Sequence, residues 1–123
     1  MRDALIDIIK KYNINEVVYE DIQLQKINDS ETAGIKTYKA LAEVIGVVRE
    51  LLTELHIKHT AVAPIVWKAT FKIAGKGRAQ EKKLSQAYVA KTYGLSCSED
   101  EADAVCIGAH YLKQQSQVYD WSE

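Results

Sequence analysis

Two aspartates three residues apart, Asp100 and Asp103, lie where the acidic stretch "SCSEDEAD" runs into the apolar stretch "AVCIG". In a helix, side chains three apart lie on one face, so both carboxylates can point at one place. An acid at a helix N-terminus can also cap free backbone N–H groups, and Asp100 suits that role. Capping explains Asp103 less well, because the helix face of Asp103 continues into Ile107. The motif therefore indicates either a helix cap or a pair of metal ligands.

A third carboxylate, Glu20, ends "EVVYE", a short β-branched and aromatic run typical of a buried strand. In open α/β sheets, functional groups gather at the carboxyl ends of the strands. Glu20 facing a helix that opens with Asp100 and Asp103 would make an oxygen-rich site, which suits Mg²⁺ or Mn²⁺. We do not expect His56 and His59 to hold a metal, because they flank a strand-like run.

Basic residues are concentrated in one segment, although the net charge of the chain is only −1. Between Lys68 and Lys83, six bases stand against a single acid, Glu81. A chain with separate basic and acidic zones often binds a polyanion with one and a cation with the other. Solvated surface charge explains the segment equally well. The candidate DNA-binding residues are Lys68, Lys72, Lys76, Arg78, Lys82 and Lys83.

The order of elements predicts an α/β fold, and a length of 123 residues suggests a single domain over 1–123. A strand, a long helix and a second strand in that order predict a parallel βαβ unit. The start of the chain is predicted to be helical, because Leu5, Ile8, Ile9 and Tyr12 recur at helical spacing. The elements expected after it are a strand over Glu16–Glu20, a loop over "DIQLQKINDSETAG", a helix from about Ala33 to Leu55, a strand in "HIKHTAVAP" ended by Pro64, a short helix or turn in "IVWKATFKI", a flexible basic loop "AGKGRAQ", a helix ended by Gly94, and a last helix from about Glu99 to Gln115.

The long helix is apolar over more of its circumference than one core face needs. Such a helix is usually buried on two sides, so its second side predicts contact with another copy of the chain. The candidate dimer residues are Tyr38, Val44, Val47, Val48 and Leu51.

The cysteines and the apolar runs bear on the cellular compartment. Cys97 and Cys106 form no CxxC pair, and no secretory segment or bilayer-spanning run is visible. We therefore expect a cytoplasmic protein with reduced thiols and no membrane partner.

Four segments carry a resemblance to a known family: "EVVYED", "AEVIGVVRELL", "AVAPIVWKATFKIAGKGRAQEKK" and "DEADAVCIGAHYL". In this order and spacing, from about Arg2 to Leu112, the chain resembles RuvC-type Holliday junction resolvases of phages and bacteria. The resemblance implies a ribonuclease-H-like fold in which Glu20, Asp100 and Asp103 are catalytic metal ligands. It also implies that Lys82, with Lys83 as the alternative, contacts DNA near the scissile phosphate, and that the long helix forms a homodimer.

The activity implied by the resemblance is metal-dependent cleavage of branched DNA such as a four-way junction. Two Mg²⁺ ions about 3.5–4 Å apart would bind the scissile phosphate. The family begins with a β-hairpin that supplies a first aspartate ligand, but the residues before Glu20 are predicted to form a helix. We therefore expect the first strands to be absent from this chain and its catalysis to be impaired. Three alternatives stay open: a non-catalytic junction-binding module, a nuclease of the same fold acting on structured RNA, and a structural dimer with solubilising charges.

Overall fold

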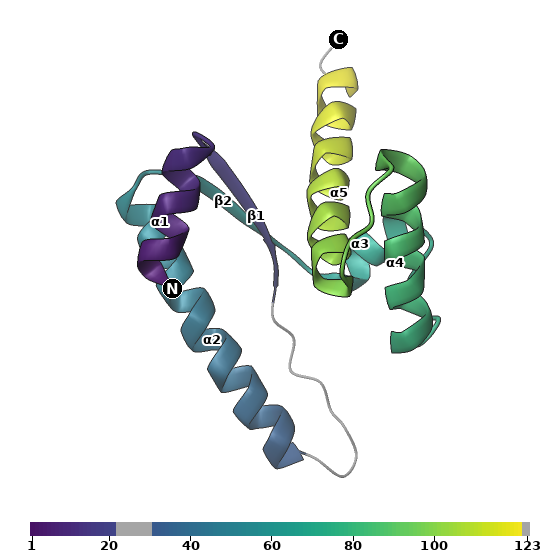
Figure 1. Ribbon diagram of the computed structural model, residues 1–123, viewed down its shortest axis with the longest axis horizontal. Helices are drawn as coiled ribbons and strands as arrows, with labels where there is room; N and C mark the ends of the chain where they lie inside the picture. Colours follow the sequence, from purple (N-terminus) through teal and green to yellow (C-terminus); the bar gives the residue numbers. More distant parts are fainter. Residues whose placement is uncertain (22–30, 122–123) are drawn as a thin grey trace. The chain divides into compact units, whose positions relative to one another are not determined.

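The computed structural model describes residues 1–21 and 31–121, which form five helices and two strands (Figure 1). The order of the elements agrees with the sequence prediction. The last helix extends past its predicted end near Gln115. The elements are α1 (Arg2–Lys11), β1 (Glu16–Glu20), α2 (Glu31–Glu54), β2 (Lys58–Val62), α3 (Pro64–Thr70), α4 (Arg78–Tyr93) and α5 (Glu99–Trp121).

The two strands pair in a parallel two-stranded sheet, with α2 between them in the sequence. This pairing confirms the predicted parallel arrangement of a strand–helix–strand unit, and the chain is of mixed α/β class. The loop predicted between β1 and α2 falls mainly on residues 22–30, which lie outside the described part of the chain.

The chain divides into two compact units. The first unit comprises Met1–Val17 and Asp21–Thr60, and the second comprises Val18–Glu20 and Ala61–Glu123. Each unit has buried residues of its own and is described below by itself.

The second unit is built on α3, α4, α5 and the last residues of the two strands. Pro64 occupies the first turn of α3, where its missing N–H costs no helical hydrogen bond. Gly94 ends α4 in the left-handed conformation, at φ 67°, and donates its N–H to the carbonyl of Ala90. The loop before α4 uses two further left-handed glycines, as its sequence predicted. The core of this unit consists of Val62, Trp67, Ile73, Val89, Ala102, Cys106 and Ile107.

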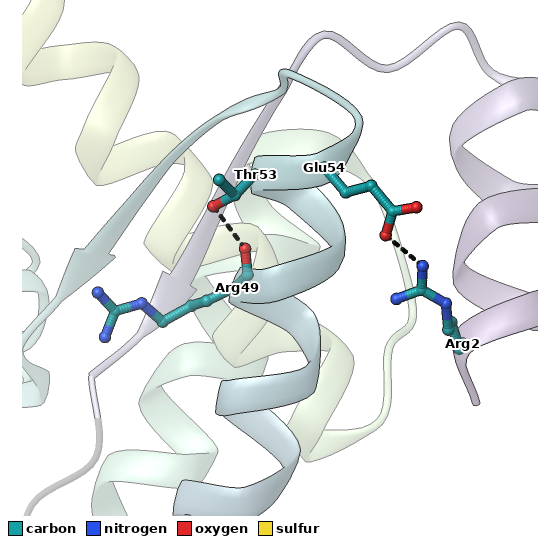
Figure 2. A network of polar contacts seen from close by, with 4 residues as sticks. All are labelled: Arg2, Arg49, Thr53 and Glu54. Carbon is teal, nitrogen blue, oxygen red and sulfur yellow. Dashed lines mark hydrogen bonds and ion pairs between the residues drawn. The ribbon is translucent and has the colours of Figure 1, made fainter.

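The first unit contains α1 and the long helix α2. Its described part buries few apolar side chains, chiefly Ile9 of α1 with Leu51 and Leu52 of α2. An ion pair between Arg2 and Glu54 joins the two helices on their exposed side (Figure 2). Charged residues complement the dipole of α1, with an acid in its first turn and two lysines in its last.

Within residues 1–21 and 31–121, no helix combines the length and the apolar character that a membrane span requires.

Candidate metal and nucleic-acid site

Glu20 lies at the carboxyl end of β1, as predicted, and one hydrogen bond fixes its carboxylate. The indole Nε1–H of Trp67 donates to Glu20 Oε2 at 2.8 Å. Both residues belong to the second unit. The indole is fully buried while Glu20 itself is exposed, so the carboxylate is attached to the core at one oxygen and open to solvent.

Trp67 reaches Glu20 because of the way in which β2 leads into α3. Pro64 starts the helix directly after the strand, and Trp67 follows one turn later, facing the core. Its ring packs among Val62, Val89 and Cys106 in the core cluster. A buried indole N–H needs an acceptor, and the end of the neighbouring strand β1 supplies one.

Asp100 and Asp103 lie in the first turns of α5, and neither of them caps the helix. The cap is a reciprocal pair formed by Ser98 and Glu101. The Ser98 hydroxyl accepts the Glu101 backbone N–H at 3.2 Å, and Glu101 Oε1 accepts the Ser98 backbone N–H at 3.1 Å. The bond from the Ser98 backbone N–H, and to a lesser extent the Ser98 hydroxyl, lowers the pKa of the Glu101 carboxyl. Of the two alternatives for Asp100, the structure excludes the helix cap, because Ser98 performs that role.

In the described part of the chain, Asp100 complements the dipole of α5 from its acidic first turn, and Asp103 lies one turn further on. Within these residues, neither carboxylate accepts a hydrogen bond or forms an ion pair. Asp100 is exposed and Asp103 is half-buried. Two unpaired carboxylates one helical turn apart remain available to a ligand.

Cys106, one turn after Asp103, is not a metal ligand of the thiolate type. Its thiol is buried in the core, and burial together with the nearby Asp103 carboxylate raises the pKa of Cys106 to about 11. The nearby Ser85 hydroxyl, which has no hydrogen-bond partner of good geometry among the described residues, opposes the shift. At neutral pH the side chain is a protonated thiol, whereas metals bind the thiolate.

The donor chemistry of the three predicted ligands fits a magnesium-type ion. Glu20, Asp100 and Asp103 all offer carboxylate oxygens, which Mg²⁺ and Mn²⁺ prefer. All three lie in the second unit. Among the residues that the structure describes, no three Asp, Glu, His or Cys side chains come close enough to form a preassembled metal centre. The structure therefore does not bring the three predicted ligands together into a ready-made site, and their binding of one ion stays a prediction.

Two of the six candidate DNA-binding residues are engaged in ion pairs. Lys68 Nζ lies 3.0 Å from Glu81 and 5.6 Å from the centre of the Trp67 ring. Lys82 Nζ lies 2.9 Å from Glu99, and this hydrogen bond raises the pKa of Lys82. Asp100 adds to the same shift, so Lys82 stands close to the acidic start of α5.

The remaining four bases are exposed and form no ion pair with any described residue. They are Lys72, Lys76, Arg78 and Lys83. All four lie in the loop before α4 or in its first turns, where free cations can approach a polyanion.

The predicted dimer residues of α2 fall into two groups. Tyr38, Val44 and Val47 are exposed, at 37%, 44% and 39% of their surface, and Val48 is half-buried. Leu51 is only 1% exposed and belongs to the core of its own unit. The exposed group lies on one long helix with three further exposed apolar side chains, which are Ile35, Leu41 and Leu55.

Besides the contact of Trp67 with Glu20, sequence reasoning missed the Ser98–Glu101 cap and a contact between α3 and α5. The Ser98–Glu101 cap is readable as the pattern Ser-x-x-Glu ahead of an apolar run. The contact between Thr70 Oγ1 and His110 Nδ1, at 2.7 Å, joins α3 to α5 across 40 positions and has no local sequence signal. Burial lowers the pKa of His110, which favours the neutral imidazole.

Comparison with known proteins adds no family. The chain matches no protein-family model, and no curated protein is significantly similar to it in sequence. The residues themselves therefore carry any functional conclusion.

Proposed function

We propose that this chain is a ribonuclease-H-like domain of the RuvC type that binds branched DNA and a divalent cation in order to cleave a phosphodiester bond. The observation that carries the proposal is the state of its three carboxylates. Glu20 stands at the carboxyl end of a strand, anchored at one oxygen, while Asp100 and Asp103 are free of the capping role that would explain them. The βαβ order and the resemblance of the four sequence segments support the same fold.

Each group has a distinct task in such a reaction. A bound Mg²⁺ or Mn²⁺ would polarise the phosphate and lower the pKa of a bound water. Glu20, Asp100 and Asp103 would hold that ion through their carboxylate oxygens. The free bases around the start of α4 would neutralise neighbouring phosphates and orient the strand.

Lys82 links the acidic and the basic parts of the site. Without DNA, its ammonium pairs with Glu99 beside Asp100. A phosphate oxygen is a competing acceptor for the same ammonium, so Lys82 can exchange Glu99 for the backbone of the nucleic acid. Because the side chain of Glu99 is 53% exposed, breaking this ion pair costs little.

Metal binding is the most direct test, because it needs no turnover. A calorimetric titration with Mn²⁺ should show saturable binding. This binding should be weakened by each of three substitutions, Glu20→Gln, Asp100→Asn and Asp103→Asn. Ser98→Ala is the matched control, since it alters the cap of the same helix and leaves all three carboxylates in place. Equal Mn²⁺ affinity in the wild type and all three carboxylate variants would show that the proposed metal site is wrong.

The substrate class is tested by competition. Labelled four-way junction should be displaced by unlabelled junction more effectively than by linear duplex or by structured RNA. Preference for RNA would favour the alternative nuclease, and junction binding without any metal-dependent nicking would favour the non-catalytic module. Where nicking is detected, Asp103→Asn should abolish it and leave junction affinity largely intact.

A further inference from the structure

Trp67 is the residue that connects the core of the second unit to the proposed metal site. Its ring is fully buried, and its only polar atom donates to Glu20 Oε2 at 2.8 Å. Trp67 and Glu20 are 47 positions apart, so the contact depends on the pairing of β1 with β2 and on the start of α3.

The indole is well suited to fixing a carboxylate in one orientation. It carries a single donor and no acceptor, so it can bond only to an acceptor oxygen of the carboxyl group. The ring has few rotatable bonds and is held among Val62, Val89 and Cys106 of the core. Lys68 lies 5.6 Å from the ring centre and is itself bound to Glu81. The donor therefore occupies a fixed position in a well-packed region.

An exposed glutamate at the end of a strand would otherwise sample several side-chain orientations. Fixing Oε2 restricts this freedom and leaves Oε1 without a hydrogen bond from the described residues. A carboxylate that binds a metal is commonly oriented by a hydrogen bond from a neighbouring residue that does not itself touch the metal. Loss of that neighbour weakens the metal affinity.

We propose that Trp67 is a positioning residue that holds Glu20 ready to bind a divalent, oxygen-seeking cation through Oε1. This inference rests on the proposed function, because it assigns Glu20 as a ligand. It goes further in naming the group that orients the ligand, and in predicting that the indole senses occupation of the site.

A different role for the same contact is that Glu20 merely satisfies a buried indole N–H. Both roles predict some loss of stability when the N–H is removed. Only the positioning role predicts a change in metal affinity. Trp67→Phe separates them, because it removes the donor and keeps an aromatic ring in the core.

The first experiment measures Mn²⁺ affinity by calorimetry for the wild type, Trp67→Phe, Glu20→Gln and Thr70→Val. Trp67→Phe should lower the Mn²⁺ affinity by roughly 10–100-fold, which is the usual effect of removing the hydrogen bond that orients a metal ligand. Thr70→Val is the matched control: it removes a hydrogen-bonding hydroxyl from the same helix, bonded to His110 and not to Glu20. Its Mn²⁺ affinity should equal that of the wild type.

The second experiment leaves Trp67 unchanged and therefore does not depend on how well Trp67→Phe folds. The chain has two tryptophans, so Trp121→Phe leaves a single indole N–H signal in a ¹H–¹⁵N spectrum. Titration with diamagnetic Mg²⁺ should shift this signal saturably. The shift should vanish when Glu20→Gln is added, because the neutral amide no longer couples the ion to the indole.

The outcomes distinguish this inference from the proposed function. If Glu20→Gln weakens Mn²⁺ binding while Trp67→Phe does not, and Mg²⁺ leaves the indole signal in place, Trp67 is only a core residue and the metal site stands. If neither Glu20→Gln nor the aspartate variants alter Mn²⁺ binding, the proposed metal site fails and the positioning role fails with it.

Discussion

The two units of the chain bury their apolar residues to different degrees. The second unit closes a core around Trp67, Val89 and Cys106, with helices α3, α4 and α5 contributing to it. In the described part of the first unit, only Ile9, Leu51 and Leu52 are buried, although α2 is the longest helix of the chain. The unit that holds the three proposed ligands is the better packed one, which suits a site that must keep its geometry.

The polar contacts of the second unit involve more deeply buried side chains than the ion pair of the first unit does. In the second unit, the contact of Trp67 with Glu20 and that of Thr70 with His110 involve buried rings. In the first unit, the ion pair of Arg2 with Glu54 is exposed at both ends, and Figure 2 shows the side chain of Arg49 pointing away from it. Exposed pairs contribute little to stability. We infer that the second unit stabilises itself, whereas the first exposes an apolar helix face that a partner can cover.

The largest expected effect tests the packing of the second unit. Trp67→Ala should lower the free energy of unfolding by about 3–5 kcal/mol, because it removes the largest buried side chain and leaves a cavity. Urea unfolding measures the loss, and amide hydrogen exchange should accelerate in α3, α4 and α5. Unchanged exchange in α4 and α5 would contradict the central place of Trp67 in this core. Trp67→Phe is the conservative control, because it keeps an aromatic ring in the core, and it should lower the free energy of unfolding by less.

The next effect tests the exposed face of α2. Val47→Glu should weaken self-association by more than roughly tenfold, because a charge buried in an apolar contact costs several kcal/mol. Sedimentation velocity over a range of concentrations measures the shift toward monomer. Thr53→Glu adds the same charge on an exposed position of the same helix and should leave association unchanged.

The wild type itself decides whether this face is an interface. If the chain stays monomeric at the highest concentration reached, the apolar side chains of α2 do not bind a second copy. In that case the difference in apolar burial between the two units still holds, and the exposed apolar face of α2 would bind a partner other than a second copy of the chain.

A smaller effect separates capping from ligation at the start of α5. Ser98→Ala removes one half of the cap and should destabilise the second unit by about 1 kcal/mol. Asp100→Asn should cost less, because its carboxylate has no hydrogen bond among the described residues. Thermal unfolding of the two variants measures the difference. A larger loss for Asp100→Asn would return the capping role to Asp100.

The same cap gives a pH dependence of defined sign. The folded state lowers the pKa of Glu101, so the ionised form is the one that stabilises the fold. This contribution is complete above the ordinary glutamate pKa of 4.5 and is lost as the pH falls through the lower, folded value. Glu101→Gln should therefore flatten the acid limb of stability against pH, and an unchanged limb would exclude Glu101 as its source.

Local signals predicted most of the elements and part of the site. The β-branched run gave β1, Pro64 marked the boundary between β2 and α3, and Gly94 gave the end of α4. These features depend on neighbouring residues alone. The Ser98–Glu101 cap is equally local, because the pattern Ser-x-x-Glu ahead of an apolar run encodes it.

Tertiary contacts were beyond the reach of such signals. The indole of Trp67 meets Glu20 only once two strands have paired, and nothing near either residue encodes the contact. Leu51 and Val47 lie in the same apolar stretch of α2, yet one is buried and the other exposed. When a helix is apolar on more than one face, periodicity cannot decide which face the chain itself covers. Whether a metal ion binds at Glu20, Asp100 and Asp103 stays a prediction.

The smallest expected effect is a change in the salt dependence of DNA binding when exposed basic residues of the two units are removed. Arg78 and Lys83 of the second unit are exposed and form no ion pair with any described residue. If each contacts one phosphate, Arg78→Ala and Lys83→Ala should each reduce the slope of log affinity against log salt by about 0.9. Arg49→Ala in the first unit is the control, since Arg49 is an exposed arginine outside the basic segment and should leave the slope unchanged. Fluorescence anisotropy with a labelled four-way junction at several salt concentrations measures all three slopes. Equal reductions in all three variants would show that DNA is bound by charge spread over both units, and unchanged slopes for Arg78→Ala and Lys83→Ala would remove the start of α4 from the interface.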